Sequence, residues 1–585
     1  MKLNDTISKV LYINLTDKSY QVKDRQDLFE KYIGGTGVAI QLLQEECPPG
    51  CDALGPDNPI IIAAGPLTPV FPLASKTVAL FKSPHTGNLG ESHCGGRTAV
   101  ALRMAGLGAV VISGKSEMPI YISIHDNKVY FRDARTLWGI SDVVTIGKII
   151  RENEPGAGTR TIMRIGRAGE ELVTYANVTA ETYRHFGRLG LGAVFGSKQL
   201  KALVVSGKRS FNMETNREFK ELYQEIYDKS VNSALMKKYH DLGTPANVKS
   251  LNEFGGLPTK NLQKTQFDEA EEITGEYLAE HYLGRRLACS NCPVGCIHIA
   301  ALREPHAAEP YFFKTSMITY DYEPIYSIGS MLGISQAKGF LKLMDRVEAL
   351  GMDVMSLGVI LAWATEAMEK GLIDEKITEG IKFEWNNAES YMQAVNAIAR
   401  RDNEFYYLLG QGVEAAAAKY GGADFALSMG GNEMAGYHTG PACHVGALIG
   451  GRHGHLDNGG YSFDQKLLVK EEVSAEKLAK ILVEEESWRQ VLSSLTICFF
   501  ARGVYDDETV LRALQVCGYD YEAADLKRIG KEIHRAKFDF KKQEGFDFAK
   551  LKISQRILDI PTTGMKFDKQ YLEAAIKEAE KLIFS

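Results

Sequence analysis

Residues 202–239 read ALVVSGKRSFNMETNREFKELYQEIYDKSVNSALMKKY, and the secondary structure that the sequence predicts changes within this stretch. Its first six residues form a short β-rich run. Residues 217–239 instead repeat apolar side chains at the 3.6-residue spacing of an amphipathic helix, with charged residues between them. The stretch therefore marks, at about residue 208, the boundary between a strand-rich part of the chain and a helix-rich part.

On the N-terminal side of this boundary, short apolar runs bounded by glycine and proline recur and predict strands. Two of these runs are joined through His125-Asp126-Asn127, which predicts a β-hairpin. The predicted strands are residues 9–15, 59–65, 77–83, 108–114, 119–124, 128–133, 161–166 and 202–207.

On the C-terminal side, residues 337–350 have helical periodicity, and residues 355–371 begin apolar nearly all round, which predicts a deeply buried helix. A glycine- and histidine-rich stretch at 430–461 interrupts the helical pattern. We find no fixed-period repeat and no low-complexity linker. The sequence predicts an α+β multidomain fold: a β-rich N-terminal domain followed by two mainly α-helical domains, with boundaries at 1–208, 209–425 and 426–585.

The length, charge and cysteine content of the chain exclude several classes of function. A chain of 585 residues is too long for one hydrophobic core. The net charge of −6, with no stripe of lysine and arginine, gives no reason to expect nucleic acid. No run of about eighteen apolar residues and no signal peptide is visible, so we expect a cytoplasmic protein without a membrane span. In that compartment the nine cysteines predict metal binding, catalysis or burial rather than a disulfide framework.

Three of the nine cysteines lie in CSNCPVGC, residues 289–296, at C-x2-C-x3-C spacing. A zinc site needs a fourth ligand nearby, and His298 could supply it. An iron–sulfur cluster takes its fourth thiolate from a distant part of the chain more readily, and Cys498 in the apolar SSLTICFF is a candidate. The spacing favours a [4Fe–4S] cluster ligated by Cys289, Cys292, Cys296 and Cys498 over zinc.

FGRLGLGAVFGSKQLKALVV, residues 186–205, combines four glycines with Arg188 and two lysines. Exposed backbone N–H groups and positive side chains suit a phosphate or pyrophosphate. The alternative interpretation is that the glycines serve only tight turns. The segment is not a Walker A loop, because that loop has Lys-Ser/Thr after GxxxxG and the order here is Gly196-Ser197-Lys198. Nor is it a dinucleotide fingerprint, because we expect no strand to lead directly into the glycines and a strand rather than a helix to follow them. GESHCGGR, residues 90–97, is a second candidate for close approach of the backbone to a ligand.

Taken together, these blocks resemble the aldehyde:ferredoxin oxidoreductase family of tungsten enzymes over almost the whole chain. The N-terminal blocks are YIGGTGVA (32–39), IIAAGPLTP (61–69), FKSPHTGNLGESHCGG (81–96), LRMAGLGAVVISGKSEMPIYI (102–122) and FGRLGLGAVFGSKQLKA (186–202). The helical part adds YEPIYSIGSMLGI (322–334), LGMDVMS (350–356) and SLTICFF (494–500) to the cysteine motif. Several blocks in the expected order are more specific than any one of them.

The resemblance implies tungsten, or molybdenum, held by the dithiolenes of two molybdopterins beside one [4Fe–4S] cluster, with Mg²⁺ bridging the pterin phosphates. The β-rich domain would lie under the two pterins and the helical domains would cover them. Asp353 would contact one pterin, and Ser493, Leu495, Thr496 and Ile497 the other. The chain departs from the family's Asp-x-x-Gly-Leu-Asp/Cys motif, since it has EALGMD at 348–353 and SSLTIC at 493–498. The second loop thus lacks both the first carboxylate and the glycine of the family's motif.

Further positions carry over from the family's phosphate-binding segments. Lys76 stands where the family commonly has arginine, and His93 where it often has asparagine near the magnesium. The remaining candidates for cofactor binding are Cys94, Gly95, Gly96, Arg184, His185, Gly187, Arg188 and Gly190. Some relatives share a metal between subunits through an E-x-x-H motif. The matching helix here reads LKLMDR, so we expect no such metal and leave a homo-oligomer or hetero-oligomer open.

The resemblance also assigns acid–base groups. Glu323 matches the family's active-site glutamate, and the competing interpretation is a carboxylate that stabilises a helix N-terminus. The active-site histidine is best matched by His455, with His453 second, in a stretch that has four histidines in eighteen residues. By spacing alone, His453, His455 and Asp457 on one side of an extended strand could instead bind a metal.

The implied activity is oxidation of an aldehyde to a carboxylic acid, with electrons leaving through the [4Fe–4S] cluster to ferredoxin or an iron–sulfur electron-transfer subunit. One alternative is the tungsten subunit of a complex that reduces aromatic acyl-CoA thioesters. Retention of Glu323 favours aldehyde chemistry, as does the lack of a cysteine in PYFFKTSMITYDY, residues 310–322. The other alternative is a non-enzymatic scaffold with a zinc knuckle.

Overall fold

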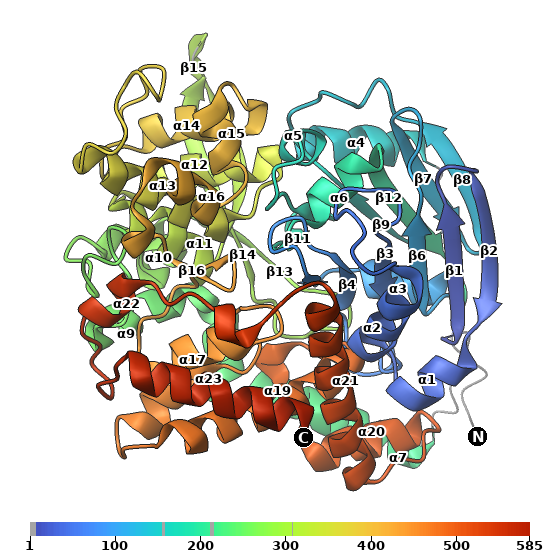
Figure 1. Cartoon of the computed structure of the whole chain (residues 1–585). Helices are drawn as coiled ribbons and strands as arrows, with labels where there is room; N and C mark the ends of the chain where they lie inside the picture. Colours follow the sequence, from blue (N-terminus) through green and yellow to red (C-terminus); the bar gives the residue numbers. More distant parts are fainter. Residues whose placement is uncertain (1–6, 155–157, 211–215, 307) are drawn as a thin grey trace.

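The computed structural model describes residues 7–154, 158–210, 216–306 and 308–585. It confirms the predicted fold class, because strands dominate the first two hundred residues and helices most of the remainder. Figure 1 shows the strand-rich part, blue to teal, beside the helical part, green to red. The C-terminal helices α19, α21 and α23 pass beneath both.

The N-terminal strands form two six-stranded sheets, ordered β2-β1-β6-β3-β4-β5 and β11-β10-β9-β12-β7-β8. If six is added to each strand number of the first sheet, the resulting order is that of the second sheet read from its other edge. Strand directions repeat as well, since β1–β6 and β7–β12 are parallel and the other pairs antiparallel. This part of the chain is therefore one folding unit built twice, a repeat of topology that no fixed sequence period reveals.

The strands of the first sheet are β1 (Lys9–Asn14), β2 (Ser19–Asp24), β3 (Ile60–Ala63), β4 (Thr77–Lys82), β5 (Leu89–Cys94) and β6 (Ala109–Ser113). Those of the second are β7 (Ile120–His125), β8 (Lys128–Asp133), β9 (Thr159–Arg164), β10 (Val178–Ala180), β11 (Arg184–Phe186) and β12 (Leu200–Gly207). Each predicted strand is present, and the predicted hairpin is β7–β8. The sequence missed four strands of these sheets. They are β2, whose residues are all exposed, β5, which lies in a segment interpreted as a glycine-rich link, and β10 and β11, which are too short to show alternation.

Helices α1 (Gln26–Tyr32), α2 (Gly35–Glu46), α3 (Thr98–Met104), α4 (Val143–Asn153), α5 (Arg167–Glu170) and α6 (Leu191–Ser197) connect these strands. Two expectations about the glycine-rich segment are wrong. β11 leads directly into Gly187, and α6 rather than a strand follows, because Gly190 adopts a left-handed conformation (φ 88°) that starts the helix.

The helical part confirms the two helices that periodicity predicted. α12 covers Ala337–Leu350, and α13 covers Val354–Glu369 with its residues buried from Met355 to Ala367. None of the described helices is both long and apolar enough to cross a membrane. The others are α7 (Arg217–Asn232), α8 (Ala234–Asp241), α9 (Asn247–Phe254), α10 (Gly275–His281), α11 (Tyr322–Ile328), α14 (Ala388–Arg400), α15 (Glu404–Leu409), α16 (Val413–Tyr420), α17 (Pro441–Ile449), α18 (Gly460–Phe463), α19 (Ala475–Ser494), α20 (Asp507–Val516), α21 (Ala523–Gln543), α22 (Gln555–Asp559) and α23 (Lys569–Phe584).

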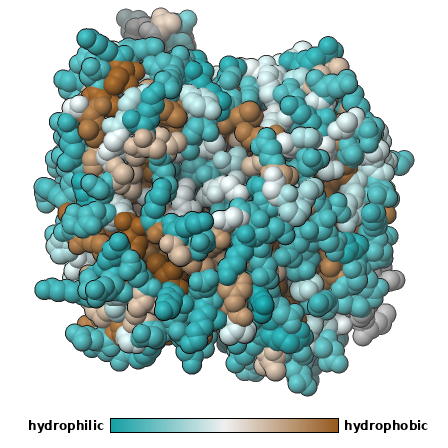
Figure 2. Space-filling model, in the orientation of Figure 1, coloured by the Kyte–Doolittle hydropathy of each residue, from teal (hydrophilic) through white to brown (hydrophobic). Residues whose placement is uncertain are grey.

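Strands also occur inside the helical part, which the sequence did not predict. β13 (Leu283–Leu287), β14 (Ile297–His306) and β15 (Glu309–Tyr320) form an antiparallel sheet, and β16 (Ser428–Met429) pairs with β17 (Asn432–Glu433). The far end of β15 projects from the molecule in Figure 1. Figure 2 shows this face of the molecule as largely hydrophilic, with most of its apolar residues over the helical half.

Two loops of the helical part rest on equivalent points of the duplicated sheets. A Cβ atom on Gly65, just after β3, would come within 2.7 Å of the Leu495 carbonyl oxygen. A Cβ atom on Gly166, just after β9, would come within 2.3 Å of the Leu350 carbonyl oxygen. Only glycine permits these approaches. Loop 493–498 therefore rests on the first sheet and loop 348–353 on the second.

Candidate active site

The structure brings Glu323 and His455 together. Glu323 lies in the first turn of α11, and His455 in a loop between α17 and α18. The backbone N–H of Gly436 donates to Glu323 Oε2 at 3.1 Å, and His455 Nε2 lies 3.3 Å from Oε1. Within the described residues, Glu323 Oε1 has no hydrogen-bond partner of good geometry. One carboxylate oxygen is thus held in place while the other remains available.

Burial moves the pKa values of this pair in opposite directions. It raises the pKa of Glu323 to about 8, and the nearby Asp321 carboxylate adds to the rise. It lowers the pKa of His455 to about 3, and the positive charge of Arg188 adds to the fall. Near neutral pH the histidine is therefore uncharged, and Glu323 can gain or lose a proton. Such a carboxyl group can act as a general acid or base.

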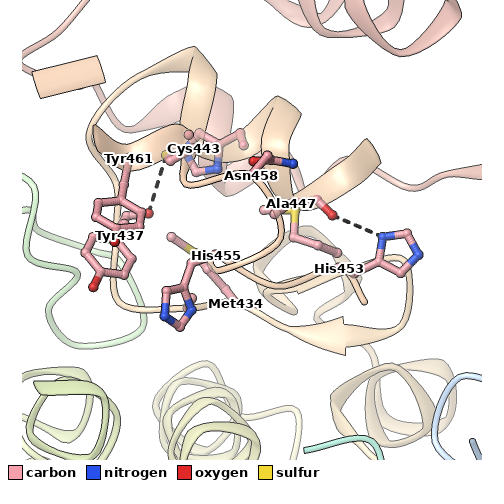
Figure 3. Close-up of a pocket in the computed structure, with 12 residues that line it drawn as sticks. Met434, Tyr437, Cys443, Ala447, His453, His455, Asn458 and Tyr461 are labelled. Atoms are coloured by element: carbon pink, nitrogen blue, oxygen red, sulfur yellow. Dashed lines mark hydrogen bonds between the residues drawn. The ribbon is translucent and has the colours of Figure 1, made fainter. Parts of the chain in front are cut away.

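Two tyrosine side chains, Tyr437 and Tyr461, line a cavity together with His455 (Figure 3). The rings of Tyr437 and Tyr461 stack at 4.1 Å between centroids and 17° between planes. Tyr437 also lies 5.3 Å from the rings of His455 and of Tyr322. The thiol of Cys443, which donates to the Gly440 carbonyl, lines the same cavity. The stack was not predicted, and its only sequence signal is that both tyrosines fall within the histidine-rich stretch.

His453 has different surroundings from His455. Its Nδ1–H donates to the carbonyl of Ala447 at 3.0 Å, drawn in Figure 3, so Nε2 accepts from the buried Lys541 ammonium at 2.7 Å. Both ring nitrogens are therefore occupied. The stretch 451–459 consists of turns, so the expected extended strand with His453, His455 and Asp457 on one side is wrong. Asp457 instead binds Arg452.

The cysteine motif closes a hairpin. Leu287, at the end of β13, pairs with Ile297, at the start of β14, so that residues 288–296 form the connecting loop. Leu73 joins this loop to Cys498, because its N–H donates to the Asn291 carbonyl and its own carbonyl accepts from the Cys498 N–H. Burial and neighbouring thiols, including Cys498, together raise the pKa of Cys292 and of Cys296 to about 12. The distant cysteine therefore lies beside the other three.

The donor set does not fit a single metal ion. Among the residues that the structure describes, no three His, Cys, Asp or Glu side chains converge as the ligands of one ion would. His298 Nε2 donates to the His240 carbonyl at 3.1 Å, and its Nδ1, which has no hydrogen-bond partner in the described residues, lies against Gly243. A four-iron cluster separates its thiolates more widely than one zinc ion does, and four adjacent thiols suit it.

Three partly buried cations lie near the two sites: Arg184 and Lys76 near the cysteines, and Arg188 near His455. Arg188 donates to Asp353 Oδ2 at 3.1 Å and to the Glu433 carbonyl at 2.8 Å. Its Nη1, like Nε of Arg184, is buried without a hydrogen-bond partner in the described part of the chain. The positive charge of Lys76 reaches the thiols of Cys94 and Cys296. Unpaired buried donors of this kind indicate an anionic ligand.

The predicted glycines lie beside these cations. A Cβ atom on Gly95 would come within 2.8 Å of Cys289 Sγ and 3.3 Å of Arg184 Nε, whereas one on Gly187 would meet nothing within 4 Å. Backbone can therefore approach a ligand closely at Gly95 and Gly187. At Gly96, with φ of 97°, the carbonyl accepts from the Ser290 N–H.

The two histidines of the phosphate segments occupy matching strands of the two sheets. His93, in β5, contacts Glu91 at 2.7 Å, and burial lowers its pKa to about 4. His185, in β11, lies 3.9 Å from Glu348, and burial lowers its pKa to about 3. Both are therefore neutral near pH 7. Cys94 is buried and its thiol donates to the Gly95 carbonyl.

The loops expected to contact the pterins share a backbone shape. Gly351 and Thr496 both adopt positive φ, 77° and 57°. Asp353 caps α13 through the N–H groups of Met355 and Ser356 as well as binding Arg188. The second loop, with Ser493, Leu495 and Ile497 buried, is held to the first sheet by a hydrogen bond between Thr496 and Thr68 and by the Lys76 N–H.

These residues fit the implied cofactors. The unpaired donors of Arg184 and Arg188, the open approach at Gly187 and the neutral histidines suit phosphate groups at both sheets. The four thiols suit an iron–sulfur cluster next to them.

Comparison with known proteins agrees with this geometry. A model of the aldehyde ferredoxin oxidoreductase N-terminal domain matches residues 10–207, and a model of domains 2 and 3 of the same family matches residues 220–581. The chain belongs to the aldehyde ferredoxin oxidoreductase family. Its members are oxidoreductases, and this chain is therefore an enzyme of that class.

Relatives within the aldehyde ferredoxin oxidoreductase family cover nearly the whole chain. Tungsten-containing aldehyde ferredoxin oxidoreductases of Thermococcus kodakarensis and Pyrococcus furiosus are both 32% identical to it, over 94% and 93% of this chain and 91% and 89% of their own. The WOR-like subunit of an aliphatic sulfonate oxidoreductase of Pyrococcus furiosus is 27% identical over 76% of this chain and 71% of its own. The BamBC active-site complex of benzoyl coenzyme A reductase shares the fold, with a TM-score of 0.84 at 21% identity over 100% of this chain and 95% of its own.

Proposed function

We propose that the protein oxidises an aldehyde to a carboxylic acid, using water as the oxygen source and releasing two protons and two electrons. The contact between Glu323 and His455 inside an aromatic cavity carries this proposal. Two relatives that are 32% identical to this chain are named tungsten-containing aldehyde ferredoxin oxidoreductases. The acyl-CoA reductase alternative rests on similarity of fold alone.

The cofactors belong to the same proposal. Arg184, Arg188, Lys76 and the glycines beside them would hold the phosphates of two pterins, bridged by Mg²⁺ near His93 and His185. Cys289, Cys292, Cys296 and Cys498 would hold a [4Fe–4S] cluster. The tungsten–pterin group supplies the two-electron chemistry when it is bound, and the cluster passes electrons on one at a time.

The protein's own residues manage the protons. Glu323 Oε1 takes the proton of the attacking water, while the Gly436 N–H fixes Oε2 and thus the orientation of the carboxylate. Neutral His455 can donate a hydrogen bond from a ring N–H to the carbonyl oxygen of the substrate. The Tyr437–Tyr461 stack excludes bulk water from this site.

Substitution of Glu323 by Gln tests the proposal. The amide keeps the shape of the side chain but cannot take a proton, so aldehyde-dependent reduction of a viologen dye should fall by about 10²- to 10⁴-fold. Tungsten and iron contents, measured on the same samples, should match those of the wild type. Full activity of a variant with normal metal content would remove Glu323 from the mechanism. Wild-type protein loaded with tungsten and inactive on a panel of aldehydes would refute the proposed function.

A further inference from the structure

The hairpin that holds the cysteine motif carries exposed positive charge at its base. We propose that Arg285 and Arg286 of β13, together with Lys237 of α8, form the docking surface for an acidic electron-transfer protein. This inference rests on the proposed function, because the docked protein would receive electrons from the cluster.

The two arginines adjoin the cluster loop by strand pairing. Arg286 pairs with His298 and Arg285 with Ile299, one and two residue pairs away from the Leu287–Ile297 pair that closes the loop. Both are exposed. They therefore lie on the strand that enters the cysteine loop and next to the strand that leaves it.

Helix α8 is fastened to the same hairpin. The Arg286 guanidinium donates to the carbonyls of His240 at 3.0 Å and Asp241 at 3.3 Å. The His240 Nδ1–H donates in turn to the Val294 carbonyl, inside the cysteine loop, at 2.7 Å. Lys237 is exposed one turn earlier on the face of α8 that carries His240. The three cations thus border the loop from two elements.

The cysteine loop itself lies close to the surface. Cys289, Cys292, Cys296 and Cys498 are all partly exposed, whereas Cys47, Cys94 and Cys517 are buried. Asn291, between the first two ligands, is exposed. Electron transfer between proteins requires a short path, and this loop offers one to a partner seated on its border.

The charge of this border selects an acidic partner. In the described part of the chain, no carboxylate lies within ion-pair distance of Lys237, Arg285 or Arg286, although the whole protein has a net charge of −6. Asp241 is the acidic side chain that accompanies them on α8. Unpaired surface cations attract a partner of opposite charge and raise its association rate. Small acidic iron–sulfur proteins have this property.

The test uses Lys237→Glu combined with Arg285→Glu, because Arg286 also holds α8 in place. With an acidic ferredoxin that carries two [4Fe–4S] clusters as electron acceptor, KM for the ferredoxin should rise by about tenfold or more at low ionic strength. The difference should shrink as salt is added, because ions screen exposed charges. Aldehyde-dependent reduction of a neutral dye or small viologen should be unchanged. A control with the same charge change at the exposed Lys376 and Lys470 should keep the wild-type KM.

An unchanged KM for ferredoxin in the double variant would overturn the proposal. So would a change of oligomeric state in sedimentation without a change of KM, since the surface would then join copies of this chain. Direct binding of the ferredoxin to cluster-containing protein, measured at low and high salt, gives the same comparison without any turnover. Loss of binding in the double variant would thus support docking even if no aldehyde is oxidised, which separates this proposal from the proposed function.

Discussion

Two contacts between a glutamate and a histidine, Glu433 with His85 and Glu323 with His455, have opposite electrostatic properties. Glu433 Oε2 lies 2.8 Å from His85 Nε2, and its Oε1 accepts from the Val413 N–H at 3.0 Å. Although burial alone would raise it, the charge and hydrogen bond of His85 lower the pKa of Glu433 to about 2. Glu323 has a longer contact with its histidine, and its pKa is raised to about 8.

The number of hydrogen bonds that each carboxylate accepts explains why the two pKa values differ. Both oxygens of Glu433 receive hydrogen bonds, and His85 is itself fixed by Thr174, so the carboxylate is charged and bridges the N-terminal and C-terminal parts. Glu323 receives one backbone hydrogen bond, so burial prevails and the proton is retained. A buried glutamate whose two oxygens both accept hydrogen bonds stabilises the fold, whereas one with an unpaired oxygen can exchange a proton.

Removing the charge from Glu433 should have the largest effect on stability. Glu433→Gln breaks a buried pair and should destabilise the protein by about 3–5 kcal/mol near neutral pH. The pKa of Glu433 is lowered, so this contribution exists above the ordinary glutamate pKa and is lost as the pH falls from about 4.5 to about 2. The matched substitution, Glu323→Gln, should stabilise the protein above about pH 4.5. There the carboxyl group ionises in the unfolded chain, whereas the folded protein keeps the proton up to about pH 8. Thermal unfolding of both variants checks this, and equal losses would erase the distinction between the two pairs.

Removing the histidine of the catalytic pair should affect activity instead. His455→Ala should lower turnover of aldehyde by about 10²-fold, because it removes a hydrogen-bond donor from the cavity. Its melting temperature should stay near that of the wild type, since His455 makes no bond of good geometry to Glu323. His453→Ala is the matched control: it removes the acceptor of Lys541, so it should lower the melting temperature more than His455→Ala does. If His453→Ala lowered turnover and His455→Ala lowered the melting temperature more, His453 would be the active-site histidine and His455 the structural one.

The smallest effect is a pH dependence. If Glu323 acts as a base it must be ionised, so kcat/KM should rise with pH and level off above an apparent pKa of about 8. His455, with a pKa lowered to about 3, stays neutral between pH 5 and 9 and should add no second bend. A rising limb near pH 4–5 would mean that Glu323 ionises like an exposed carboxylate. Glu323→Gln should remove the limb from whatever activity remains.

Much of the fold follows from the sequence, because the change from period 2 to period 3.6 near residue 208 is a local property. The duplicated sheet does not, since strands of three residues such as β10 and β11 carry no period of their own. Cys498 could be proposed from composition and resemblance, but the bridging role of Leu73 depends on tertiary structure. Spacing could not separate His453 from His455, two residues apart. Lys541, eighty-eight residues away, distinguishes them.

The duplicated base has a consequence for how the chain meets its ligand. Gly65 and Gly166 stand at matching points of two copies of one unit, and each admits one loop of the helical part. Such a base presents two halves of the same strand topology. A ligand made of two like halves can bind there with similar contacts on either side. The two sides differ where Thr496 corresponds to Gly351 and Cys498 to Asp353, so the two halves of such a ligand have different surroundings.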